Sequence, residues 1–421
     1  HTRFRNVTWS SDVCSSDLTP ERRTVHASRV SAPIHIDGKL DEAFYTQVEA
    51  VSGFIQIEPQ DGAPATEKTE MWIGFDNDNV YVSFRCWESR MDRITAKEMR
   101  RDNSVIWGGD DNVVYYFDTF NDGRNGFQFV MNSIGGRTDG QAYNDGAYNG
   151  DWNGVWDLAV GRFEGGWTVE TAVPFKSLRY QPGAEQTWGI NVVRTNRWKN
   201  EVSYLNKVPK ERGQAGVHFS SVTGQLTGIV APSGSRNIEV KPYAISNING
   251  QAAVAGGRVR NNLNQNIGVD GKYGLTQNTN LDLTYNTDFA QVEVDQQQVN
   301  LTRFSLFFPE KRDFFLENAG TFAFGGTNNF FNQSDTPILF YSRRIGLERG
   351  QVVPIRGGGR LTGKVGAYTL GVVNMQTSDE PAVNAAPTNF SVVRVKRDLL
   401  RRSRDRKSTR LNSSHVSESR M

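Results

Sequence analysis

The chain has 421 residues, more than one compact domain usually holds, and this length predicts two domains. Its 48 Lys and Arg nearly balance its 46 Asp and Glu, so the formal charge of +2 creates no field that would favour nucleic acid. The mean hydropathy is −0.54 and no stretch approaches the ~18 apolar residues of a transmembrane helix, which excludes a helical membrane protein but not a β-barrel.

Both ends of the chain look foreign to the rest. Residues 1–23 and 403–421 are rich in Ser and Arg and show no apolar period. Segments of this composition cannot bury enough apolar surface to fold, so we expect both tails to be disordered. We therefore expect the native fragment to span about residues 24–400.

Tryptophan placement divides the remaining chain. Outside the first tail, eight tryptophans run from Trp72 to Trp198 and none follows. A stretch rich in Pro, Gly and Ser at 231–235 marks the boundary. We therefore predict a first domain over 28–230 and a second over 236–400. The 41 glycines suit turn-rich, all-β domains.

The first domain shows the period of two that is typical of strands. Residues 71–75 and 80–86 alternate around a turn at 76–79, which predicts a hairpin. Further alternating runs occur at 113–117, 127–131, 167–173 and 188–192. Two brief helices are expected at 40–48 and 94–100. Short strands at this spacing predict an antiparallel β-sandwich.

The second domain alternates over longer runs. Ile267, Val269 and Tyr273 face one way, while Asp270 and Lys272 face the other. The pattern recurs at 281–289, in a hairpin formed by 360–364 and 367–373, and at 390–399. Runs of ~9–11 residues with this division are typical of an outer-membrane β-barrel, here truncated. A soluble sheet with one wet face would show the same alternation.

Residues 304–317 break this pattern. Their aromatic residues come in pairs rather than at every second position, and charged residues separate the pairs. The segment is therefore not a spanning strand, and either a lumen plug or a packed turn is consistent with it.

Loops of the first domain carry residue types that bind sugars. Aromatic rings lie against the C–H faces of sugars, and planar polar groups bond adjacent hydroxyls. Trp167 and Trp188 lie inside alternating strands and are expected in the core. The candidate carbohydrate-binding residues in and beside the loops are Trp107, Asp110, Asp111, Arg124, Asn132, Asp139, Trp152 and Trp156.

Other chemistries are less well represented. The same loops offer oxygens for a structural calcium ion, but Phe120 interrupts the calcium-loop spacing at 118–123. A glycoside hydrolase needs two carboxylates, and no motif selects a pair among the available Asp and Glu. The five histidines lie in tails, near the domain start or alone, and no Ser or Cys motif accompanies them. We therefore predict no catalytic residue, and a structural calcium ion is the only cofactor that the loops suggest.

Several motifs resemble known families. IDGKLDEA at 36–43 and GWTVETAVPF at 166–175 resemble the opening and closing motifs of family-nine carbohydrate-binding modules. NTDFAQVEVD at 286–295, FPEKR at 308–312, FFLE at 314–317 and YSRRIG at 341–346 resemble the barrel of an uncharacterised bacterial outer-membrane family. Together these likenesses cover about 28–400.

This resemblance implies a carbohydrate partner, surrounding outer-membrane lipid and placement in the outer membrane of a Gram-negative bacterium. The sandwich would face the periplasm or the cell surface, and a partner enzyme of polysaccharide breakdown would act beside it. Two alternatives stay open: a hydrolase of O-glycosyl bonds, and a structural cap that docks a partner on the barrel.

Overall fold

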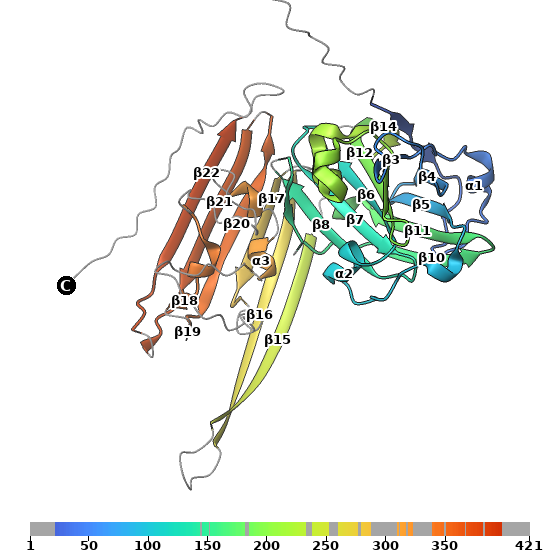
Figure 1. The fold of residues 1–421 in the computed structure, drawn as a ribbon. Coiled ribbons are helices and arrows are strands. Elements are labelled where there is room, and N and C mark those ends of the chain that lie inside the picture. The colour runs from blue at the N-terminus through green and yellow to red at the C-terminus, as the bar shows by residue number, and fades with distance from the viewer. Residues whose placement is uncertain are drawn as a thin grey trace, which may run out of the picture.

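The computed structural model describes residues 22–143, 145–150, 152–181, 185–232, 238–251, 260–276, 279–287, 310, 312–316, 319–322, 339–348, 351–366, 368–381 and 384–397. This part of the chain is mostly β (Figure 1). The predicted tails lie outside these ranges except for residues 22 and 23, so their disorder stays a prediction.

Two sheets form a sandwich in the N-terminal half. The larger has the strand order β1-β14-β12-β6-β7-β8-β9, with β13 also paired to β12 and β3 paired to β13. Its strands are β1 (Thr24–His26), β3 (Ile55–Glu58), β6 (Asn112–Asp118), β7 (Gly126–Asn132), β8 (Arg137–Tyr143), β9 (Ala147–Asn149), β12 (Glu185–Asn196), β13 (Glu201–Tyr204) and β14 (Gly224–Val230). All pairings in this sheet are antiparallel except that of β1 with β14.

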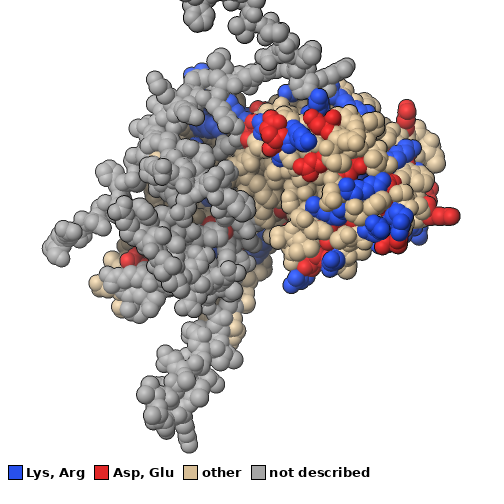
Figure 2. Space-filling view, viewed as in Figure 1, with Lys and Arg blue, Asp and Glu red and all other residues tan. Residues whose placement is uncertain are grey.

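The smaller sheet has the order β10-β11-β5-β4-β2. Its strands are β2 (Ser28–Arg29), β4 (Thr69–Phe75), β5 (Asn79–Trp87), β10 (Asp157–Phe163) and β11 (Gly166–Pro174). The predicted antiparallel sandwich is therefore confirmed. Trp167 and Trp188 are 1% and 0% exposed in the main core cluster, as their strand positions predict. Figure 2 shows acidic and basic side chains interspersed on the visible face of the sandwich.

The predicted hairpin is formed by β4 and β5. Met71 lies opposite Phe84, and Phe75 opposite Val80. Asp76 closes the turn, because its Oδ1 accepts hydrogen bonds from the backbone N–H groups of Asp78 and Asn79, both at 2.7 Å. An Asp that bonds its own chain in this way is typical of a tight turn.

One of the two predicted helices is correct. The helix α1 (Ala43–Gln47) lies within the expected range 40–48, but residues 94–100 form no helix, and α2 (Ser104–Gly108) follows them. The physical reason is competition for backbone donors. The N–H groups of Lys97 and Glu98 donate to the Asp110 carboxylate at 3.1 and 3.3 Å, whereas a helix would need them for its own carbonyls.

The 3-10 turns of the N-terminal half are η1 (Met91–Arg93), η2 (Phe175–Ser177), η3 (Lys210–His218) and η4 (Ser220–Val222).

A third sheet follows the sandwich. Its six strands are antiparallel neighbours in the order β15-β16-β17-β20-β21-β22. They are β15 (Ile238–Gln251), β16 (Arg260–Thr276), β17 (Thr279–Tyr285), β20 (Ile355–Val365), β21 (Tyr368–Thr377) and β22 (Asn389–Arg397). The predicted β20–β21 hairpin is present, and β16 contains the predicted run at 267–275. β17 and β22 form the described parts of the runs at 281–289 and 390–399, except that β17 ends at Tyr285, while 288, 289, 398 and 399 lie outside the described residues. Within the described residues β15 and β22 each pair on one side only, so the sheet is open and no closed barrel is seen.

The third sheet has an inner and an outer face of opposite character. The inner face carries Asp282, Thr284, Arg360 and Thr362, all at most 5% exposed. The outer face carries exposed apolar side chains: Ile238, Val240, Ile267, Val269, Leu275, Leu283, Tyr285, Val365, Tyr368, Val393 and Val395. A sheet of a water-soluble domain normally shows the reverse arrangement, with its apolar face buried.

A short helix covers the inner face. In α3 (Asp313–Leu316), Phe314 and Phe315 pack in one cluster with Val373 and Met375 of β21. The Arg360 guanidinium lies 5.1 Å from the centre of the Phe314 ring. Phe314 and Phe315 thus pack on the sheet and the segment does not extend it, as predicted, while 304–309, 311 and 317 lie outside the described residues.

The remaining elements of this half are η5 (Ala319–Thr321), η6 (Ser342–Arg344), β18 (Leu347–Glu348) and β19 (Gln351–Val352). None of the helices in the described ranges has the length and apolar character needed to cross a membrane.

Candidate functional site

Three of the eight predicted binding residues lie buried beneath the loop that precedes β6. Asp110, Asp111 and Asn132 are at most 3% exposed. Asp110 accepts a hydrogen bond from Asn132 Nδ2 at 2.8 Å, and Asp111 accepts one from the Arg197 backbone N–H at 2.8 Å. These side chains fasten loops to the sheet. We place no ligand on them because they have no surface to offer one.

Three more predicted residues lie inside the sandwich. Trp152 and Trp156 are 8% and 2% exposed, and both pack edge-on against the Phe129 ring. Asp139 is fully buried beside them and accepts from Arg101 Nη2 at 2.7 Å. Burial raises the pKa of Asp139. The segment 152–156 therefore returns its tryptophans to the core, and sugar cannot reach their ring faces.

Trp107 is half-buried, and a histidine covers its ring. The His218 imidazole stacks on Trp107 with ring centres 5.3 Å apart and on Tyr148 at 4.6 Å. Burial lowers the pKa of His218 to about 4, so the imidazole is neutral at neutral pH. One face of the Trp107 ring is thus covered by protein and is closed to a sugar.

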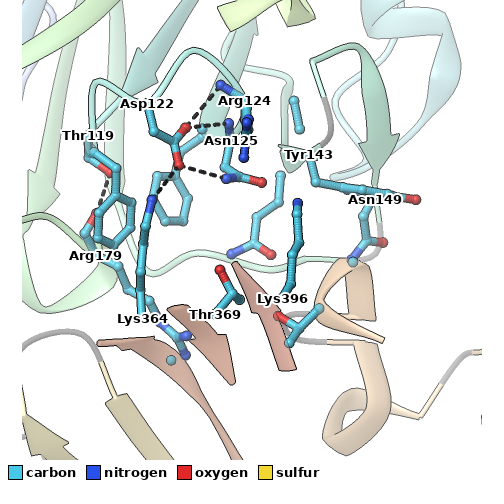
Figure 3. A pocket seen from close by; sticks show the side chains of 18 residues that line it. Thr119, Asp122, Arg124, Asn125, Tyr143, Asn149, Arg179, Lys364, Thr369 and Lys396 are labelled. Atoms are coloured by element: carbon cyan, nitrogen blue, oxygen red, sulfur yellow. Dashed lines mark hydrogen bonds and ion pairs between the residues drawn. The ribbon is translucent and has the colours of Figure 1, made fainter. Parts of the chain in front are cut away.

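Of the eight predicted residues, Arg124 lines the cavity described next. This cavity has a volume of about 140 Å³ and lies between the sandwich and the third sheet (Figure 3). Its lining on the sandwich side consists of Thr119, Phe120, Asp122, Arg124, Asn125, Gly126, Phe127, Gln141, Ala142, Tyr143, Asn149 and Arg179. Gly320, Thr321, Gly363, Lys364, Thr369 and Lys396 complete it on the other side.

The turn between β6 and β7 builds the sandwich wall. Asn121 and Gly123 have positive φ values of 48° and 68°, which Asn and Gly tolerate best. Asp122 Oδ1 accepts from the Arg124 backbone N–H at 2.9 Å, and its Oδ2 accepts from Asn125 Nδ2 at 3.0 Å. The Asp122 carboxylate therefore holds the turn in the shape that presents Arg124 and Asn125.

The sheet wall is a row of three residues on neighbouring strands. Thr369 of β21 lies opposite Lys364 of β20 and opposite Lys396 of β22. All three belong to the inner face. Lys364 Nζ lies 3.3 Å from the Asp122 carboxylate and 5.9 Å from the centre of the Phe120 ring, so it joins the two walls.

A second carboxyl group lies behind the turn. Asp118 is fully buried and accepts from the Gly123 backbone N–H at 2.8 Å. Burial raises the pKa of Asp118 well above its ordinary value, and the nearby Asp122 carboxylate raises it further. Asp118 therefore shapes the wall of the cavity but does not line it.

Sequence reasoning missed the sheet wall. Alternation places Lys364 and Lys396 on the polar side of predicted strands, and this is the one signal that the sequence offers. It gives no indication that Lys364 meets Asp122, because 242 positions separate them along the chain.

Neither a metal site nor a catalytic pair stands out in the described part of the chain. No three His, Cys, Asp or Glu side chains come together there in a way that could hold a metal ion. Among the described lining residues Asp122 is the only carboxylate, whereas glycoside hydrolysis uses two. A structural calcium ion elsewhere stays a prediction.

Comparisons with known proteins cover different parts of the chain. Residues 237–355 match a domain of unknown function, DUF5916. This match takes in much of the third sheet and less than half of the chain. No curated protein matches the chain.

Similar solved structures cover about half of the chain. A family-nine carbohydrate-binding module from Caldicellulosiruptor kristjanssonii in complex with cellotriose has 16% identity and a TM-score of 0.36, and covers 51% of this chain and 95% of that one. The complex of such a module with glucose has 16% identity and a TM-score of 0.36, and covers 51% of this chain and 98% of that one. A protein from Bacteroides uniformis, described as a putative carbohydrate-binding protein, has 12% identity and a TM-score of 0.41. It covers 49% of this chain and 99% of that one. Similarities this low say nothing of what this chain binds.

Proposed function

We propose that this chain binds carbohydrate in the cavity between its sandwich and its third sheet, and that the third sheet belongs to an outer-membrane β-barrel. The observation that carries the binding proposal is the lining of the cavity. It joins aromatic rings to planar amide and guanidinium groups around a volume of about 140 Å³.

The aromatic and planar groups come from adjoining elements of the sandwich. Phe120 and Asn125 belong to the β6–β7 turn, and Gln141 and Tyr143 to the end of β8. Amide groups offer a donor and an acceptor in one plane, which matches two neighbouring hydroxyls of a sugar. The aromatic rings supply the apolar surface that a sugar's C–H face requires.

The reversed faces of the third sheet support the membrane proposal. Ile238, Tyr273, Leu281, Leu361, Val372 and Val393 form one continuous row across all six strands on the outer face. One position along on the inner face, Glu239, Lys272, Asp282 and Arg360 form a row of alternating charge. Apolar residues outward and paired charges inward are the arrangement of a strand wall in lipid.

Exposure strengthens this reading. Ile238 is 70% exposed and Leu283 51% exposed, whereas Arg360 is 2% exposed. In water such a surface would favour aggregation, and in a bilayer it would contact acyl chains. The sandwich would then lie at the mouth of the barrel, with the cavity opening where the two meet.

Titration calorimetry of the full chain in detergent against neutral and acidic oligosaccharides tests the binding proposal. Gln141→Leu removes an amide from the cavity without changing charge, and we expect about a fivefold loss of affinity for the loss of one hydrogen bond. Gln225→Leu is the matched control, because Gln225 is an exposed strand residue outside the cavity. A folded protein that binds no sugar would refute the proposal and favour the structural cap.

A further inference from the structure

The cavity is lined by more basic than acidic side chains. Arg124 and Arg179 come from the sandwich, and Lys364 and Lys396 from the sheet. Asp122 is the single acid among the lining residues that the structure describes. This excess of basic lining side chains favours an anionic guest over a cationic one.

The two lysines are fixed in register. Lys364 and Lys396 lie on the same face with only β21 between their strands, which places their backbones roughly 10 Å apart. The Lys364 ammonium is held against Asp122 at 3.3 Å. Figure 3 shows Lys396 rising from the sheet into the cavity, toward the wall that carries Arg124 and Asn125.

Arg124 and Lys396 thus approach the same space from opposite walls. A guanidinium group binds an oxyanion through two parallel N–H groups, and an ammonium group adds a compact charge. The uncharged partners around them are amides and aromatic rings, which suit the remainder of a sugar.

We propose, building on the carbohydrate proposal above, that the cavity selects oligosaccharides bearing an oxyanion and binds that oxyanion between Arg124 and Lys396. A uronic acid carboxylate and a sugar sulfate share this chemistry. We commit to the carboxylate, because the whole group is planar like the guanidinium fork of Arg124 and pairs with it through two parallel hydrogen bonds.

The test compares three trimers of the same linkage on the full chain in detergent: β-1,4-linked glucose, its glucuronic acid counterpart and a sulfated glucose trimer. We expect the acidic trimers to bind about tenfold more tightly than the neutral one, since charge-assisted hydrogen bonds exceed neutral ones. Raising the salt concentration should weaken the acidic trimers alone. If the sulfated trimer binds more tightly than the glucuronic acid trimer, the oxyanion site stands, but the carboxylate is wrong as its ligand and a sugar sulfate takes its place.

Variants locate the site. Lys396→Gln and Arg124→Gln should each lower affinity for the acidic trimer about five- to tenfold and change the neutral trimer less than about twofold. Lys207→Gln, at an exposed lysine outside the cavity, should change neither. Asp122→Asn keeps an oxygen to hold the turn and should raise affinity for the acidic trimer. Circular dichroism checks that each variant is folded.

The outcomes separate the two proposals. Equal affinity for neutral and acidic trimers, or equal losses for both in Lys396→Gln, overturns the oxyanion site and leaves carbohydrate binding intact. Binding of none of the trimers overturns both.

Discussion

Arg360 and Asp282 form an ion pair that is buried on the inner face of the third sheet. The Nε and Nη2 atoms of Arg360 approach Asp282 Oδ2 at 3.0 and 2.8 Å, and the two residues lie directly opposite each other on β20 and β17. One residue further along β17, Leu283 points to the other face and is 51% exposed. The sheet thus carries this ion pair on its inner face and exposed apolar side chains on its outer face.

Removing one partner of this pair should be costly. Arg360→Ala leaves the buried Asp282 carboxylate without its two hydrogen bonds from the guanidinium group, and we expect the free energy of unfolding to fall by about 3–5 kcal/mol. Lys39→Ala breaks an exposed pair with Asp37, which solvent screens, and should cost much less. Denaturant unfolding in detergent measures both. Similar small losses in the two variants would mean that the inner face is wet rather than buried.

Neighbouring positions on β15 should report opposite environments. In a Cys14→Ser background, a fluorophore on Val240→Cys should be quenched by lipids with brominated acyl chains, because Val240 lies on the outer face. The same label on Glu239→Cys, on the inner face, should be quenched much less. Equal quenching at both positions would contradict the membrane orientation of the sheet.

Glu170 should make stability depend on pH. Its carboxylate accepts from the Tyr45 hydroxyl at 2.7 Å and from the Gly38 backbone N–H at 2.8 Å, and burial raises its pKa from 4.5 to about 7. The folded state keeps this proton to higher pH than the unfolded state does. The contribution of Glu170 to stability is therefore complete below pH 4.5 and declines as the pH rises to 7.

Thermal unfolding across this pH window checks the effect. In the wild-type chain the free energy of unfolding should fall by up to about 3 kcal/mol across this window. Glu170→Gln should abolish this fall, while Glu164→Gln, at an exposed carboxylate, should leave it unchanged. A slope that persists in Glu170→Gln would assign the dependence to other groups.

Trp152 should matter for stability. The Trp152→Ala variant empties a position packed against Phe127 and Phe129, and we expect a loss of about 3–5 kcal/mol in the free energy of unfolding. Trp87→Ala, at a tryptophan that is 37% exposed, should lose less. If Trp152→Ala keeps full stability and loses sugar binding instead, the loop opens in solution and Trp152 returns as a binding residue.

Much of the fold could be predicted from the sequence, because alternation is local information. The β4–β5 hairpin, the strands around Trp167 and Trp188 and the two-faced strands of the third sheet all follow from a period of two. The expected helix at 94–100 failed for a non-local reason. Helix propensity is read from the residues of the segment itself. Asp110, which accepts hydrogen bonds from the backbone of Lys97 and Glu98, lies outside that segment.

The candidate site was harder to predict. A tryptophan in a polar loop has the same sequence signature whether its ring meets solvent or turns back into the core, and Trp152 and Trp156 turned back. Arg124 was found because it lies in a Gly- and Asp-rich turn. Its counterpart Lys396 looked like one polar position among many, and only the packing of the third sheet against the sandwich brings it to the cavity.

The ion pair between Lys364 and Asp122 has a consequence for how the protein is made. A ribosome completes the sandwich well before it reaches β20, and it reaches Lys396 later still. The pocket therefore does not exist on the nascent chain until the last described strand has been added and paired. On the proposal that this cavity binds carbohydrate, a sandwich produced alone would lack the sheet wall, and a ligand screen on it would give a false negative.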